Sequence, residues 1–156
     1  MMKGCEYSDD LKIVDRSNKN KENNEMMYEI NEDYLLAGNP QTNGRVLNEL
    51  AKSEDLKVRK RVAENPSSCL ATLYRLLFDS EADVRLSLSY NQYVPEFFIE
   101  HLVYDPDDDV RFALAENSRL TQELLTILVN DENPYVASRA SKSLKQTCCG
   151  PSGCAA

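Results

Sequence analysis

Apolar side chains recur along residues 34–145 with a common spacing of 26 residues. The same spacing relates three separate apolar columns, which makes a chance match improbable. These columns are Val58, Val84, Val110 and Val136; Leu50, Leu76, Leu102 and Leu128; and Leu47, Leu73, Ile99 and Leu125. A shared period of this length is typical of stacked structural repeats, in which each unit buries its apolar face against its neighbours.

Each repeat is predicted to contain two helices. Apolar residues fall at positions 98, 99, 102 and 103 and again at 124, 125, 128 and 129, a spacing that gives one apolar helix face. The segment before each of these helices is shorter, with room for about two helical turns. Pro95 and Thr121 occupy one column and suit the start of the second helix. The pattern therefore predicts an all-α fold, an α-solenoid of about four helical hairpins.

Two polar columns share the period and are interpreted as structural. They are Asn39, Asn65, Asn91 and Asn117, and Arg59, Arg85 and Arg111. Asn side chains satisfy the backbone groups of turns, so this column predicts a repeated turn. The Arg side chains are expected to pair with turn carboxylates such as Asp79 and Asp105.

The repeat segment resembles the leucine-rich repeat variant family, a HEAT-like group of α-solenoids. The resemblance rests on Val-Arg at 58–59, 84–85 and 110–111, Ala-Glu-Asn-Pro at 63–66, Ala-Glu-Asn at 115–117, and Leu-Leu-x-x-Leu at 124–128. It implies that the repeats form a right-handed α-solenoid that serves as a scaffold. Some family members carry an N-terminal cysteine cluster for an iron–sulfur centre, but this chain has only Cys5 there, so that feature does not carry over.

The chain is predicted to have three parts. Residues 1–33 are polar, and the run NKNKENNE at 18–25 lacks an apolar anchor, so this segment is expected to be disordered. Residues 34–145 form the repeat domain, and residues 146–156 form a flexible cysteine-containing tail.

Aromatic residues break the columns of the third repeat. Tyr90, Tyr93, Phe97 and His101 stand where sister repeats carry mainly polar residues. Phe97, His101 and Tyr104 share one helix face by their i, i+4, i+7 spacing. Clustered exposed aromatics are typical of a partner-binding site. The alternative is that the terminal segments fold back and cover them. His101 alone has no neighbours at metal-ligand spacing, which disfavours a metal role.

Composition narrows the classes of function. The formal net charge is −8, and an acidic chain without a basic face is poorly suited to nucleic-acid binding. No apolar run is long enough to span a membrane, and the N-terminus lacks a signal-peptide pattern, so a cytoplasmic location with reduced thiols is expected. No phosphate loop or catalytic triad is present, which predicts a protein that is not an enzyme.

Three of the five cysteines lie near the C-terminus as Cys148, Cys149 and Cys154, a CC-x₄-C pattern with Gly150, Pro151 and Gly153 between them. Three clustered thiolates suit a soft ion, and a trigonal sulfur set suits arsenite, whereas zinc requires a fourth ligand. The pattern resembles the cysteine site of arsenic metallochaperones. A redox or disulfide role and an unligated tail are the alternatives.

The leading interpretation is a non-enzymatic helical-repeat scaffold that binds a protein partner and carries this three-cysteine site for a soft metal or metalloid. The alternative is a metal or metalloid carrier or sensor, of arsenite type or related to iron–sulfur chemistry, that uses the repeats for docking. A DNA-binding HEAT-like protein is disfavoured by the acidic balance and the absence of Trp.

We expect Cys148, Cys149 and Cys154 to act as one chelating unit when titrated with arsenite or zinc under reducing conditions. Each single Cys→Ser change should lower affinity, because two thiolates chelate less well than three. Zinc uptake should release protons and weaken as the pH falls below the thiol pKa. Cys5→Ser and Cys69→Ser serve as controls with little expected effect. Equal binding by the wild type and the triple serine variant would rule the site out.

Overall fold

The computed structural model describes residues 31–148, which form nine α-helices and no β-strand. The prediction of an all-α fold is therefore confirmed for this part of the chain. The helices are α1 (Glu32–Gly38), α2 (Gly44–Leu50), α3 (Leu56–Glu64), α4 (Leu70–Leu77), α5 (Ala82–Tyr90), α6 (Glu96–Leu102), α7 (Asp108–Glu116), α8 (Gln122–Val129) and α9 (Pro134–Cys148). None of these helices is long and apolar enough to cross a lipid bilayer.

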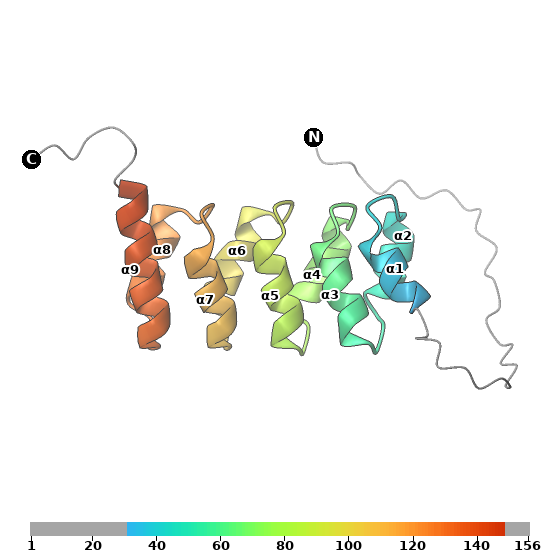
Figure 1. The fold of residues 1–156 in the computed structure, drawn as a ribbon, viewed down its shortest axis with the longest axis horizontal. Helices are drawn as coiled ribbons and strands as arrows, with labels where there is room; N and C mark the ends of the chain where they lie inside the picture. The colour runs from blue at the N-terminus through green and yellow to red at the C-terminus, as the bar shows by residue number, and fades with distance from the viewer. Residues whose placement is uncertain (1–30, 149–156) are drawn as a thin grey trace, which may run out of the picture.

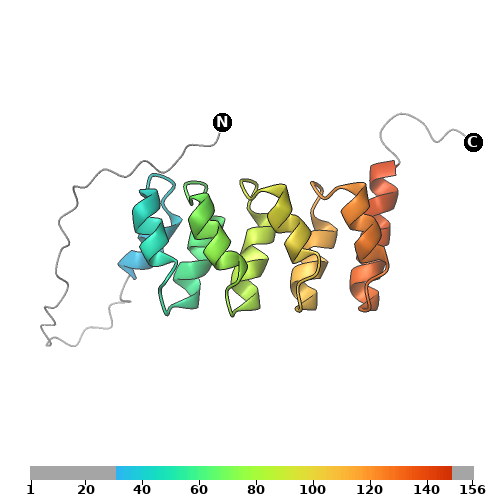
Figure 2. The same ribbon diagram turned by 180° about the vertical axis from the view of Figure 1, so that it is seen from behind.

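The helices lie in two rows. The odd-numbered helices α1, α3, α5, α7 and α9 form one row, in which each packs on the next, and the even-numbered helices lie behind them (Figure 1). Figure 2 shows the row of even-numbered helices from the other side. Packing of each helix on the next but one is consistent with a helical repeat arrangement. The apolar columns fill the space between the rows, where Val58, Val84 and Val110 are completely buried.

Recurrent capping residues set the helix boundaries. The Asn column ends the first helix of each repeat, because Asn65, Asn91 and Asn117 are the C-caps of α3, α5 and α7. Pro95 and Thr121 precede α6 and α8 as N-caps, as their column predicts, and the Thr121 hydroxyl accepts a hydrogen bond from the Leu124 amide. The short first segment of each complete repeat is α-helical over nine residues.

The Asn side chains join consecutive repeats. Asn65 Nδ2 donates to the carbonyl oxygens of Ala37 and Asn39 in the preceding repeat, and its Oδ1 accepts from the Ser67 amide. Asn91 and Asn117 repeat this arrangement by donating to Ala63 and Ser89. At the next position of the column, Ser143 donates to Ala115 instead. The structural interpretation of this column is confirmed, because its amide groups satisfy helix-end carbonyls.

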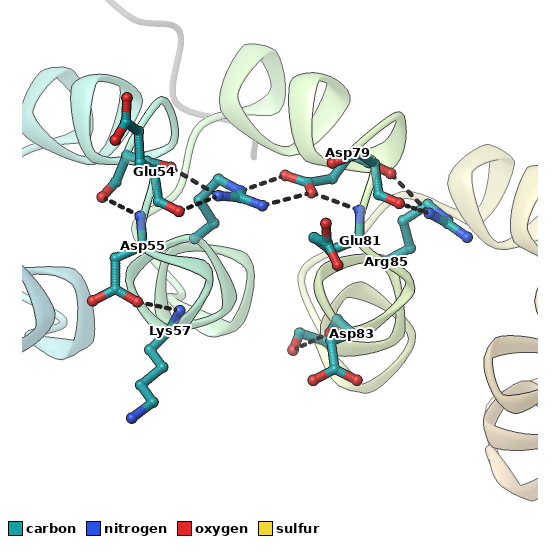
Figure 3. A network of polar contacts seen from close by, with 11 residues as sticks. Glu54, Asp55, Lys57, Asp79, Glu81, Asp83 and Arg85 are labelled. Carbon is teal, nitrogen blue, oxygen red and sulfur yellow. Dashed lines mark hydrogen bonds and ion pairs between the residues drawn. The ribbon is translucent and has the colours of Figure 1, made fainter.

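The Arg column forms a continuous ladder of ion pairs with the turn aspartates. Arg59, Arg85 and Arg111 donate through Nε and Nη2 to the carboxylates of Asp79, Asp105 and Asp131, with Nε–Oδ2 distances of 2.8, 2.7 and 2.7 Å. Each arginine also donates through Nη1 to the backbone of the preceding turn. Figure 3 shows Asp79, whose carboxylate binds one guanidinium group and whose carbonyl oxygen binds Arg85. The predicted pairing with Asp79 and Asp105 is confirmed.

These ion pairs are largely removed from solvent. The Arg85 and Asp105 side chains are 12% and 4% exposed, and the Arg111 and Asp131 side chains are 9% and 7% exposed. Hydrogen bonding to the aspartates raises the pKa of Arg59, Arg85 and Arg111 despite opposing desolvation. In turn, the hydrogen bond from Arg111 lowers the pKa of Asp131, with burial opposing and the Asn133 amide assisting. The bidentate geometry holds both charges in place.

Asp105→Asn should lower the free energy of unfolding by about 3 kcal/mol, because it leaves the buried Arg85 guanidinium without a counter-charge. Asp83→Asn is the matched control. Its carboxylate pairs with Lys60 at 2.9 Å but is 56% exposed, so the loss should be below about 1 kcal/mol. Urea unfolding followed by circular dichroism measures both. Equal losses would show that the ladder stabilises no more than a surface ion pair.

Acid should destabilise the wild type partly through Asp131. Its folded-state pKa is lowered, so its contribution to stability is complete above the ordinary carboxyl pKa and disappears as the pH falls through the lowered value. We therefore expect the wild-type unfolding free energy to fall more steeply below about pH 4 than that of Asp131→Asn. Thermal unfolding across this range gives the comparison, and parallel profiles would contradict a role for this carboxylate.

Candidate protein-binding site

A strip of apolar and aromatic side chains crosses the outer surface of α4 and α6. We call Leu70, Tyr74, Phe78, Phe97 and His101 the aromatic strip. All five residues are exposed. The Tyr74 and Phe78 side chains, on neighbouring turns, meet edge to face with ring centroids 5.2 Å apart. Phe78 reaches His101 on the next repeat at 5.0 Å, so the strip is continuous across two repeats.

The helix period explains why these side chains share a surface. Leu70, Tyr74 and Phe78 are four residues apart along α4, and Phe97 and His101 are four residues apart along α6. Residues at this spacing lie one above another on a helix. The core uses the adjoining face, where Leu73, Leu76 and Leu77 of α4 are buried. The strip is therefore additional to the core and does not form part of it.

Buried Phe98 anchors the strip to the core. Its side chain is completely buried and lies under both helices, with its ring 4.5 Å from Phe97 and 6.1 Å from Tyr74. Phe97 itself remains 52% exposed, and Phe78 is 57% exposed. Aromatic rings in contact with a fixed ring beneath them lose less conformational freedom when a partner covers them.

The aromatic residues that the sequence predicted to form a binding site fall into two groups in the structure. Phe97 and His101 belong to the strip. Tyr90 ends α5, Tyr93 lies in the turn before α6, and Tyr104 follows α6; all three are exposed. Among the described residues, the ring contacts do not include these three tyrosines.

Three of the five strip residues were not among the predicted site residues. The predicted site was confined to aromatic residues of the third repeat and its following turn, where they break their columns. Leu70, Tyr74 and Phe78 belong to the second repeat, and Phe78 shares a column with Tyr104. The i, i+4, i+8 spacing of these three apolar residues was a usable signal, since they fall outside the apolar face that the leucine columns define.

A groove lies between α6 and α8, next to the aromatic strip. It encloses about 180 Å³ and is lined by Val94, Glu96, Ile99, Asn117, Arg119, Leu120, Thr121 and Leu124. Its apolar lining comes from Val94, Ile99, Leu120 and Leu124, and charged Glu96 and Arg119 are exposed at its edge.

The predicted metal-binding residues fall largely outside the described part of the chain. Cys149 and Cys154 lie beyond residue 148, and Cys148 is described only as the last residue of α9. Cys69, the N-cap of α4, is half-buried with its Sγ 3.3 Å from Thr72 Oγ1. Within residues 31–148 no group of three or more His, Cys, Asp or Glu residues is arranged to hold a metal ion.

No protein-family model, no curated protein and no solved structure matches this chain. The class is therefore defined by architecture alone: an all-helical protein whose short helices pack sequentially, with the i/i+2 pattern of a helical repeat.

Proposed function

We propose that this protein is a right-handed α-solenoid of the HEAT-like, leucine-rich repeat variant type, which acts as a non-enzymatic scaffold and binds a protein partner. Two ladders with the repeat period support the architecture, since Asn and Arg side chains link successive repeats in the same way each time. Arrays of this kind present extended binding surfaces. The repeated polar residues are engaged in stacking, so recognition is assigned to the residues that vary between repeats.

The aromatic strip is the observation that carries this proposal. Clusters of exposed aromatic residues are characteristic of interaction sites. Aromatic side chains such as Tyr contribute a large part of the binding free energy in many interfaces. In the strip, Tyr74 and Phe78 contact each other and bridge to the next repeat, while their sister positions in the first repeat are Asn48 and Lys52. The fold accepts polar residues at these columns, so the aromatic side chains are not required for stacking.

The three-cysteine tail supplies the second candidate function, a carrier or sensor for a soft metal or metalloid that docks through the repeats. The CC-x₄-C spacing of Cys148, Cys149 and Cys154 favours it. The two functions are separable, because the strip and the tail can be altered independently. A scaffold function predicts partner binding that survives the triple serine change in the tail.

Replacing Tyr74 and Phe78 together with Asn should weaken partner binding at least about tenfold, because both rings lose their contact area. The free energy of unfolding should change by no more than about 0.5 kcal/mol, since Asn occurs at both columns in sister repeats. Quantitative affinity capture, compared between wild type and variant, identifies the partners whose retention depends on the strip. Dissociation constants for those partners then test the magnitude.

Tyr135→Asp is the matched control for this experiment. Tyr135 is 76% exposed on α9, away from the strip, and its column holds Asp83 and Asp109 in other repeats. It removes one exposed aromatic ring without touching the candidate site. Partners lost equally from the control and from the double variant would contradict the proposed site, and unfolding of the double variant would show that its rings belong to the core.

A further inference from the structure

We infer that the partner presents a basic segment with apolar anchors, which lies across the aromatic strip and into the groove between α6 and α8. This inference rests on the proposed scaffold function and specifies the chemistry of its partner. Three features of the described residues carry it: the charge of the central repeats, the position of three glutamates beside the strip, and the apolar lining of the groove.

The central repeats are strongly acidic. Residues 70–132, which begin with α4, contain 13 Asp and Glu against four Arg and no Lys. Two of these arginines, Arg85 and Arg111, are held in the buried ladder and contribute little positive charge to the surface. Arg75 and Arg119 are the two exposed cations of this segment. A surface with this imbalance attracts basic segments and repels acidic ones.

Part of this negative charge lies directly beside the strip. Glu96 and Glu100 are exposed on α6 one turn apart, and Glu100 follows Phe97 by three residues, so these two side chains are neighbours on the helix surface. Glu123 is exposed on α8 in the same column as Phe97. Within residues 31–148 none of these three glutamates forms an ion pair. Their carboxylates are thus available to a cationic partner.

The helix period shows which side of the strip the glutamates occupy. Tyr74 and Phe78 of α4 make ring contacts with Phe98 and His101 of α6, which identifies the side of α4 that faces the next repeat. Glu100 occupies on α6 the column of Tyr74 and therefore faces α8 in the same way. Glu96 lines the groove between α6 and α8. Glu96 and Glu100 consequently lie between the strip and the groove, whereas Glu123 is carried by α8.

The groove suits an apolar side chain. Ile99, Leu120 and Leu124 line it, and its volume of about 180 Å³ admits one aliphatic or aromatic anchor. Neighbouring helices pack about 10 Å apart, which is close to two turns of a helical segment or three residues of an extended one. One anchor in the groove and another on the strip can therefore come from a single short segment, with Lys or Arg side chains reaching Glu96, Glu100 and Glu123.

The test is a selection of random short peptides displayed on phage, with the full-length protein as bait under reducing conditions. We expect enriched peptides to combine Lys or Arg with large apolar residues. Affinity should fall about tenfold when Glu96, Glu100 and Glu123 are all changed to Gln. It should also fall when the ionic strength rises from about 0.1 M to about 1 M, because the Debye length shortens from about 10 to about 3 Å.

The matched control changes Glu32, Glu54 and Glu132 to Gln, which removes the same charge from exposed positions away from the strip. Affinity should change less than twofold. An equal loss in both triple variants would attribute binding to overall charge and overturn the inference. Enriched peptides that are neutral or acidic but need Tyr74 and Phe78 would overturn it while leaving the scaffold function intact. Enriched peptides whose affinity is unchanged when Tyr74 and Phe78 are replaced would contradict both the inference and the proposed scaffold function. If no peptide is enriched, the inference alone is overturned.

Discussion

Buried ion pairs between Arg and Asp hold successive repeats in place. Asp79 and Asp105 each bind two arginines: Asp79 accepts from Arg59 through its carboxylate and from Arg85 through its carbonyl oxygen, and Asp105 does the same with Arg85 and Arg111. Removing one partner of a buried pair leaves an uncompensated charge, which is more costly than never having had the pair. The ladder therefore fixes the relative position of successive repeats and discourages other ways of packing the same apolar faces.

The ladder ends where the Arg and Asp columns end. At its first step Arg59 donates to the backbone of Ser53 and Glu54, and Ser53 occupies the Asp column. At the far end Ala137 replaces the arginine, and α9 continues as a single longer helix. Ser143 still makes the inter-repeat hydrogen bond of the Asn column. The last helix, α9, is thus linked to the preceding repeat through the Asn column but carries no arginine that would extend the Arg–Asp ladder.

Because stacking depends on the inner columns and the turns, the outer positions of the even-numbered helices are free to vary. In α4 and α6 these positions carry the aromatic strip, and beside it Glu96 and Glu100 carry negative charge. Apolar contact and charge then act together. Rings supply the area that excludes water, and carboxylates at the edge favour a partner of opposite charge during encounter. The buried arginines leave this charge largely uncompensated at the surface.

The helices, their period and the chemistry of the repeated columns follow from the amino-acid sequence alone. Spacing fixed the buried face of each helix, and recurrence identified Asn and Arg as structural, because a residue needed at every interface must appear in every repeat. Which exposed aromatic residues contact one another depends on how the helices pack in three dimensions. Tyr74 and Phe78 join His101 across two helices, whereas Tyr90, Tyr93 and Tyr104, close in sequence, lie outside the ring cluster. Contacts between helices depend on how side chains pack across a repeat boundary. The 26-residue alignment gives a residue's position within its own repeat, but it does not show which residue of the next repeat it contacts.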